Sequence, residues 1–197
     1  MAKFSSQHVH DRPAWLSDPK LQEIDLGKKS VWLDFNGVIN FAPSKEIDFV
    51  ETVTNRLFAC CDGNICWLST WAFENVEKSL PANFPCVEDL LTNKGDFFDG
   101  RAVRQIEKAL QWPRLPVSCD ISCVFSAFGK VVFLLCAIDK GIITKPICWI
   151  DDDPWVLEKD TIDFVLERLP GSLCILVDNK KGLTLENVEC IEKWFRL

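Results

Sequence analysis

Three short, largely apolar runs in this chain each lead directly into polar residues, and this repeated pattern constrains the fold more than any other feature. The runs and the residues that follow them are 31–33 before Asp34, 64–68 before Ser69, and 146–150 before Asp151, Asp152 and Asp153. Each run predicts a short buried strand. After the first run, Gly37 releases the backbone from strand geometry.

Between and after these runs, apolar residues recur at helical spacing. The segments concerned are 47–57, 131–138, 155–166 and 188–195. This alternation predicts an α/β fold, with three α/β/α layers around a parallel, Rossmann-like sheet. Because ligands of such folds bind at the carboxyl ends of the strands, we expect Asp34, Ser69 and Asp151 to meet in one crevice.

Taken alone, Asp34 has two interpretations: it could cap a turn after its strand, or it could be a nucleophile or a metal ligand. The acidic residues after the third run favour the second interpretation. Three successive carboxylates, Asp151 to Asp153, repel one another unless a cation compensates their charge. Mg²⁺ is the cation we predict, because it prefers a few carboxylate oxygens and needs no His or Cys; Zn²⁺ fits this set less well.

The order of these residues resembles the haloacid dehalogenase-like (HAD) superfamily of aspartyl-phosphate enzymes. The matching motifs are Asp34-Phe35-Asn36-Gly37, then Ser69, then Lys130 at a predicted helix start, then Asp151-Asp152. Lys140 and Lys145 are alternatives for the third motif. More narrowly, the segments 67–71, 149–153 and 182–184 look like a small capless HAD group associated with RNA-repair proteins. The clear departure is Asn36, where phosphatases of the superfamily carry a second Asp.

The resemblance implies a role for each matched residue. Asp34 would be the nucleophile, Ser69 would hydrogen-bond the phosphoryl oxygens, and Lys130 would stabilise the developing charge. Mg²⁺ would be held by Asp34, the backbone carbonyl of Asn36, and Asp151 or Asp152.

The expected function is therefore a Mg²⁺-dependent HAD-like phosphatase, a phosphoric monoester hydrolase acting through an aspartyl-phosphate. The alternative is a catalytically impaired or non-catalytic HAD-like binding module, because Asn36 replaces the usual second Asp.

The expected organisation is an N-terminal arm at 1–29 and a single HAD-like domain at 30–197. An irregular insertion at 81–128 contains several prolines, and no segment is suited to a large cap. An open crevice favours a large phosphorylated substrate, a protein or, as the narrower hypothesis, a nucleic-acid end.

Charge and cysteine content bear on partners and compartment. The net charge is −7 and basic residues do not cluster, which argues against an extended nucleic-acid-binding surface. The first twenty residues lack the apolar segment of a signal peptide, so we expect a cytoplasmic protein whose ten cysteines are thiols. No segment reaches the length of a membrane span.

Several local features are also predicted. Pro154 suits the first turn of a helix that would include Trp155, with Asp153 as its cap. A last helix would be capped by Thr184. Helices are further expected at 71–80 and 101–112, and three tryptophans inside the predicted strands are expected to pack in the core: Trp32, Trp67 and Trp149.

Overall fold

The structure is a computed structural model, and it describes residues 24–39, 47–69, 107–108, 112 and 127–197. The described strands are β1 (Ser30–Leu33), β2 (Ile65–Trp67), β3 (Ile147–Asp151) and β4 (Leu173–Leu176). The described helices are α1 (Ile47–Cys60), α4 (Ala127–Asp139), α5 (Lys159–Arg168) and α6 (Leu185–Arg196).

The four described strands form one sheet in the order β2-β1-β3-β4, and every pair in it is parallel. Leu33 at the end of β1 is opposite Trp67 of β2 on one side and Ile150 of β3 on the other. The residues that follow Leu33, Trp67 and Ile150 therefore lie together at the carboxyl ends of these strands. The prediction of a parallel α/β fold is confirmed.

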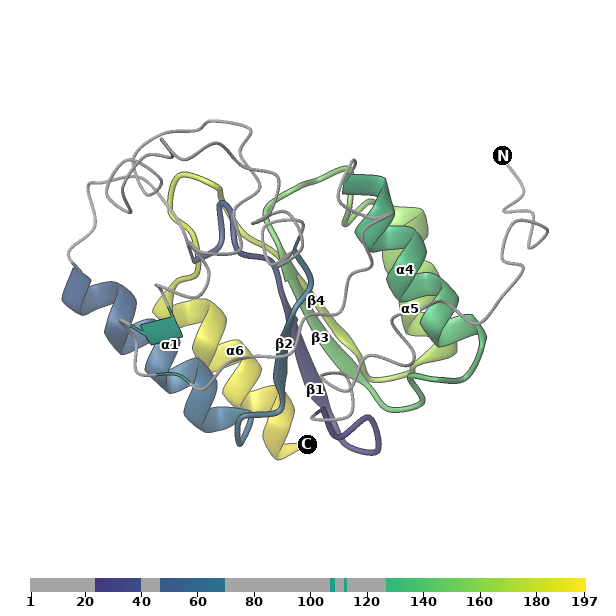
Figure 1. The fold of residues 1–197 in the computed structure, drawn as a ribbon, viewed down its shortest axis with the longest axis horizontal. Coiled ribbons are helices and arrows are strands. Elements are labelled where there is room, and N and C mark those ends of the chain that lie inside the picture. Colours follow the sequence, from purple (N-terminus) through teal and green to yellow (C-terminus); the bar gives the residue numbers. More distant parts are fainter. Residues whose placement is uncertain (1–23, 40–46, 70–106, 109–111, 113–126) are drawn as a thin grey trace, which may run out of the picture.

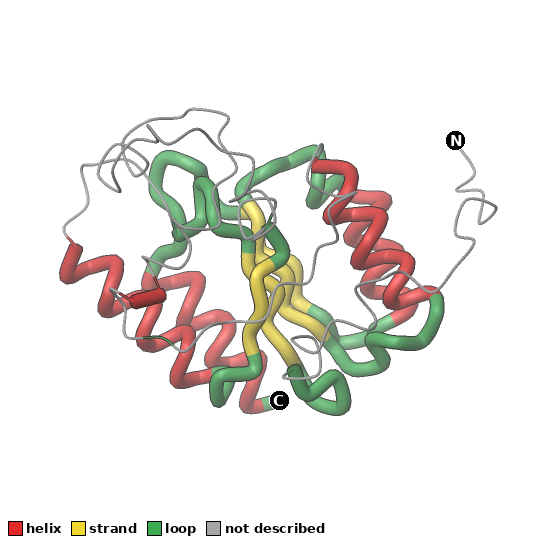
Figure 2. The backbone as a smooth tube through the Cα atoms, in the orientation of Figure 1, coloured by secondary structure: helices red, strands yellow, loops and turns green. Residues whose placement is uncertain are grey.

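Helices cover both faces of this sheet (Figure 1; Figure 2). The pair α1 and α6 packs on one face, and the pair α4 and α5 packs on the other. Each face has its own hydrophobic core, so the residues of β1, β2 and β3 are buried whichever way they point, whereas β4 at the side of the sheet is partly exposed. This explains why the strands appear in the sequence as continuous apolar runs rather than alternating ones.

The tryptophans in the strands are core residues, as predicted. Trp32 and Trp149 face the α4 and α5 side, whereas Trp67 faces the α1 and α6 side, and none is more than 1% exposed. The indole of Trp67 donates a hydrogen bond of 2.8 Å to Oε1 of Glu107. That bond connects Glu107 to β2, the outer strand of the described sheet.

The predicted helix start at Pro154 is wrong, because α5 begins only at Lys159. The carboxylate of Asp153 accepts a hydrogen bond from Trp155 N, and its carbonyl accepts from Val156 N and Leu157 N. These bonds close a turn in place of a first helical turn. Asp153 therefore caps a turn, and not the start of a helix as predicted.

The other local predictions have mixed outcomes. The cap of the last helix is confirmed, since Thr184 and Asn187 form a capping box at the start of α6. Glu107 and Lys108 are helical, whereas Trp112 is not, so the helix expected at 101–112 ends before its last residue. The rest of that helix and all of 71–80 lie outside the described residues. Among the described residues, no helix is long and apolar enough to span a membrane.

Candidate functional site

Three carboxylates converge at the carboxyl ends of the two central strands. Asp34 directly follows β1 and Asp151 is the last residue of β3, so strand pairing alone places them side by side. Asp34 N donates to Ile150 O at 3.0 Å, which fixes that register. With Asp152 they offer carboxylate oxygens that all lie within 4.8 Å of one another. The predicted meeting of these acidic residues is observed.

Gly37 allows the third carboxylate to approach. It has a φ of +70°, and a Cβ atom added there would lie 2.0 Å from Oδ2 of Asp152. Any other side chain would displace that carboxylate and strain the backbone. The sequence pointed to Gly37 as the end of strand geometry, but its contact with Asp152 was missed, because it joins two loops that are far apart in the chain.

Lys130 completes the cluster from α4. Its Nζ lies 2.9 Å from Oδ2 of Asp34 and 2.8 Å from Oδ2 of Asp151, and the residue is only 5% exposed. The alternatives, Lys140 and Lys145, are both exposed. Lys145 also precedes β3 and so lies at the opposite end of the strands. Of these three lysines, Lys130 is the one in contact with the carboxylates.

The electrostatics of the cluster follow from burial and crowding. Burial and the charge of Asp34 raise the pKa of Asp151 to about 7, although Lys130 opposes this shift. The same two causes raise the pKa of Asp152 to about 6. Burial alone would lower the pKa of Lys130, but its two carboxylate neighbours outweigh burial and raise it.

The donor set fits a hard divalent cation. When all three carboxylates are ionised, they and the one ammonium carry a formal charge of −2, and all the ligand oxygens of this set come from Asp side chains. Mg²⁺ and similar ions prefer such oxygen ligands, whereas Zn²⁺ sites are built mostly from His and Cys. The residues present thus suit a divalent ion, with Asp34, Asp151 and Asp152 as its ligands.

Two other predicted site residues lie near this edge. Ser69 is fully buried, and Leu68 N donates to Leu33 O at 2.8 Å, so Ser69 leaves the sheet beside Asp34. Asn36 is exposed, in the loop two residues beyond Asp34. The roles expected for Ser69 and Asn36 remain predictions.

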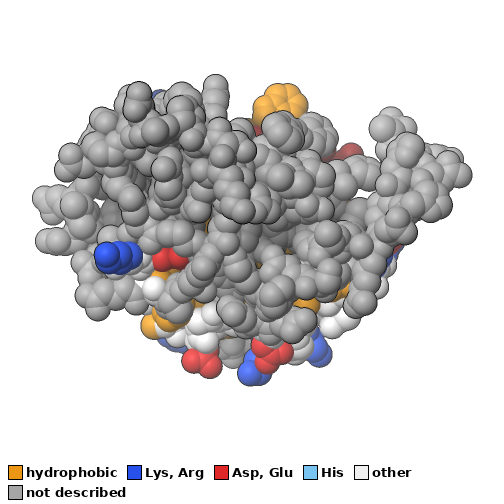
Figure 3. Space-filling model, viewed as in Figure 1, with side chains coloured by type: hydrophobic (Ala, Val, Ile, Leu, Met, Phe, Trp, Pro, Cys, Tyr) orange, Lys and Arg blue, Asp and Glu red, His pale blue; other side chains and the backbone are white. Residues whose placement is uncertain are grey.

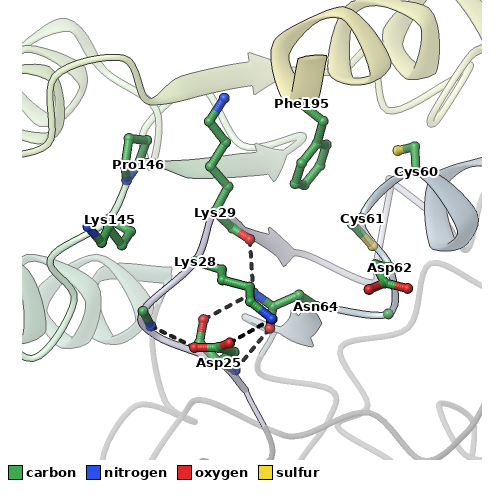
Figure 4. Close-up of a pocket in the computed structure, with 12 residues that line it drawn as sticks. Asp25, Lys28, Lys29, Cys60, Cys61, Asp62, Asn64, Lys145, Pro146 and Phe195 are labelled. Atoms are coloured by element: carbon green, nitrogen blue, oxygen red, sulfur yellow. Dashed lines mark hydrogen bonds and ion pairs between the residues drawn. The ribbon is translucent and has the colours of Figure 1, made fainter. Parts of the chain in front are cut away.

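A separate hollow of about 610 Å³ lies at the opposite end of the strands (Figure 4). Asn64 organises it by donating to the carbonyls of Asp25 and Lys29. Burial raises the pKa of the Cys60 thiol to about 11 and that of Cys61 to about 12, and both thiols donate to backbone carbonyls of α1. These two cysteines at the end of α1 are therefore protonated.

Comparisons of the chain with protein-family models, with curated proteins and with solved structures found no match. The described residues establish a parallel α/β fold that carries three carboxylates and a lysine at the ends of its central strands. The functional assignment therefore depends on the chemistry of those four side chains.

Proposed function

We propose that this protein is a Mg²⁺-dependent phosphohydrolase of the HAD type that acts through an aspartyl-phosphate on Asp34. The observation that carries the proposal is the position of Lys130, whose ammonium contacts both Asp34 and Asp151 inside the acidic cluster. A lysine that only balanced surface charge would not need to be buried. A lysine that orients a nucleophilic carboxylate and contacts an incoming phosphate must lie buried within the site.

The metal would be held by Asp34, Asp151 and Asp152, with the backbone carbonyl of Asn36 as a further expected ligand. When bound, it would neutralise the repulsion between the phosphate and an anionic nucleophile. Lys130 would hold Oδ2 of Asp34 and so orient that carboxylate toward phosphorus. Ser69 would donate a hydrogen bond to a phosphoryl oxygen.

The reaction would proceed in two displacements. A carboxylate oxygen of Asp34 forms a bond to phosphorus, and the bond from phosphorus to the leaving-group oxygen breaks. Water then attacks the aspartyl-phosphate, which releases inorganic phosphate and restores Asp34. Asn36 has no titratable proton to give to the leaving oxygen, so substrates whose leaving group departs as a stable anion should react best. Acyl and activated aryl phosphates are of this kind.

The second candidate is a binding module that holds metal and phosphate without turnover. The identity of residue 36 favours it, because an amide cannot serve as the general acid. Both candidates use the same acidic cluster, so metal binding alone does not separate them.

Phosphate release from acetyl phosphate tests the choice. We expect Mg²⁺-dependent release that is abolished by chelation and by Asp34→Asn, which preserves shape but removes the nucleophile. Asp62→Asn is the matched control, since Asp62 is exposed and lies outside the cluster. Binding of Mg²⁺ without any release from acetyl phosphate would favour the binding module. Release that persists in Asp34→Asn would exclude Asp34 as the nucleophile.

A further inference from the structure

An exposed tryptophan lies next to the acidic cluster in the chain. Trp155 is 74% exposed, and among the aromatic side chains that the structure describes it is the only exposed one. It is three residues beyond Asp152, so its Cα lies within roughly 11 Å of that residue even if the chain were fully extended. Figure 3 shows an exposed hydrophobic group beside acidic atoms at the upper edge of the molecule, the edge at which the strands end in Figure 1.

The backbone on both sides of Trp155 is held in place. Before it, Asp153 accepts a hydrogen bond of 2.8 Å from Trp155 N, and Asp153 N itself donates to Oδ1 of Asp151 at 3.1 Å. After it, Val156 and Leu157 are buried in the core beneath α4 and α5. These bonds and the two buried neighbours fix the backbone at Trp155, so the point from which the exposed indole projects is defined.

An indole in this position can attract a ligand that the net charge of the protein does not attract. The chain carries a net charge of −7, so an anionic substrate gains no general attraction toward its surface. Stacking on an aromatic ring does not depend on net charge, and every nucleobase has a face on which an indole can stack. A nucleotide also places a sugar between its phosphate and its base. That separation suits a phosphate at the acidic cluster and a base on the exposed ring of the turn that follows Asp152.

We infer that Trp155 is a stacking platform for the base of a nucleotide whose phosphate enters the acidic cluster. The inference rests on the proposed function for the position of the phosphate. It makes Trp155 a positioning residue that selects substrates carrying a base, whether free nucleotides or the ends of a nucleic acid. An isolated contact of this kind accounts for recognition by a chain whose basic residues do not cluster in the sequence.

The test compares ligands that differ only in the base. Adenosine 5′-monophosphate and ribose 5-phosphate are measured on the full chain with Mg²⁺, both by calorimetry and as competitors of acetyl phosphate hydrolysis. We expect Trp155→Ala to weaken adenosine 5′-monophosphate at least about tenfold while ribose 5-phosphate and acetyl phosphate are unchanged. Trp155→Phe should retain most of the wild-type preference for adenosine 5′-monophosphate over ribose 5-phosphate. Leu166→Ala, at another exposed apolar side chain, is the control.

The outcomes separate the inference from the proposed function. Base-dependent binding lost in Trp155→Ala supports the inference even if acetyl phosphate is not hydrolysed. Equal binding of the two ligands by the wild-type protein overturns it, even if acetyl phosphate is hydrolysed. Equal weakening of the binding of both ligands by Trp155→Ala also overturns the inference, because Trp155 would then only stabilise the turn that carries it and would not contact the base. If phosphotyrosine bound more tightly than the nucleotide, and this binding depended on Trp155, the inference would also be overturned. The ligand of Trp155 would then be a peptide side chain and not a nucleobase.

A second arm distinguishes the two sources of the nucleotide. A 5′-phosphorylated oligonucleotide and the mononucleotide are compared at equal concentration of ends. Tighter Trp155-dependent binding of the oligonucleotide supports nucleic-acid ends as the source, and tighter binding of the mononucleotide supports a free nucleotide.

Discussion

Gly37 lies so close to Asp152 that a Cβ atom at position 37 would meet its carboxylate oxygen at 2.0 Å. Asp152 can therefore join Asp34 and Asp151 only because residue 37 has no side chain. The contact makes the geometry of the candidate metal site depend on a residue that offers no ligand atom.

Gly37→Ala should consequently weaken Mg²⁺ binding at least about tenfold, because Asp152 must move away from the other ligands. The positive φ should add a loss of roughly 1 kcal/mol or more in the free energy of unfolding. Calorimetric titration and denaturant unfolding measure the two effects. Gly141→Ala is the matched control, since Gly141 has a φ of +67° but no atom near its added Cβ. It should lose stability and keep metal affinity; a similar loss of affinity in both variants would contradict the role of Gly37.

Lys130→Met should remove the ammonium and leave two buried carboxylates facing each other. Breaking a buried ion pair by removing one partner costs about 3–5 kcal/mol, so we expect a loss of this size at neutral pH. Part of it should return on adding Mg²⁺, which replaces the missing positive charge, and phosphate release should fall sharply. Lys159→Met, at an exposed lysine on α5, should change little. If Lys130→Met were as stable as the wild type without metal, the ion pairs would not matter to the fold.

Mg²⁺ affinity should rise with pH between about 5 and 8. The pKa of Asp151 is raised to about 7 and that of Asp152 to about 6, so below these values metal must displace protons. Binding should weaken by about tenfold or more as the pH falls from 7 to 5, with proton release detectable as a buffer-dependent enthalpy. Affinity that is independent of pH, or that survives Asp151→Ala with Asp152→Ala, would place the metal elsewhere.

The metal-free protein should show the opposite trend in stability. A carboxyl group whose pKa is raised by folding holds its proton in the folded chain at a pH where the unfolded chain has lost it. The resulting contribution to the free energy of unfolding is complete below the pKa of Asp in the unfolded chain, about 4. It is lost as the pH rises through the pKa of about 7 that Asp151 has in the folded chain. Thermal unfolding in chelator should therefore show this site becoming less stabilising from pH 4 to 7. Asp151→Asn should flatten that part of the profile.

Asn36→Asp should restore a residue that can protonate the leaving oxygen. Turnover of alkyl phosphates should increase roughly a hundredfold, much more than that of acetyl phosphate, because acetate needs no proton to depart. Mg²⁺ binding should be unaffected, since the backbone carbonyl is the expected ligand at this position. If neither protein hydrolyses any phosphate, the binding module becomes the better description. High alkyl-phosphatase activity with Asn36 present would point to another acid, such as Asp153.

The acidic pair at the core of the site was predictable from the sequence because of a simple geometric rule. Apolar runs buried on both faces identify β1 and β3, and parallel strands bring their carboxyl ends together, so Asp34 and Asp151 had to approach each other once these strands were neighbours. Lys130 was predictable as a helix-start residue, but its choice over Lys140 and Lys145 required contacts.

The features that sequence reasoning missed all depend on contacts between distant segments or on local competition. Asp153 satisfies the backbone groups after it with its own oxygens, so the helix that Pro154 suggested does not begin there. Trp155 was assigned to an apolar helical face and is instead exposed in that turn. The contact of Gly37 with Asp152 depends on how two loops meet, which no local pattern encodes.

The pairing of β1 with β3 also sets when this site can come into being. Asp34 directly follows the first described strand, whereas its partner Asp151 comes after a long intervening stretch of chain. During synthesis the ribosome releases Asp34 well before β3, so a nascent chain holds one carboxylate of the set and no lysine beside it. Metal capture should then begin only when the second half of the chain has emerged. Binding of the ion would thus report that synthesis has passed residue 152 and that the central strands have joined.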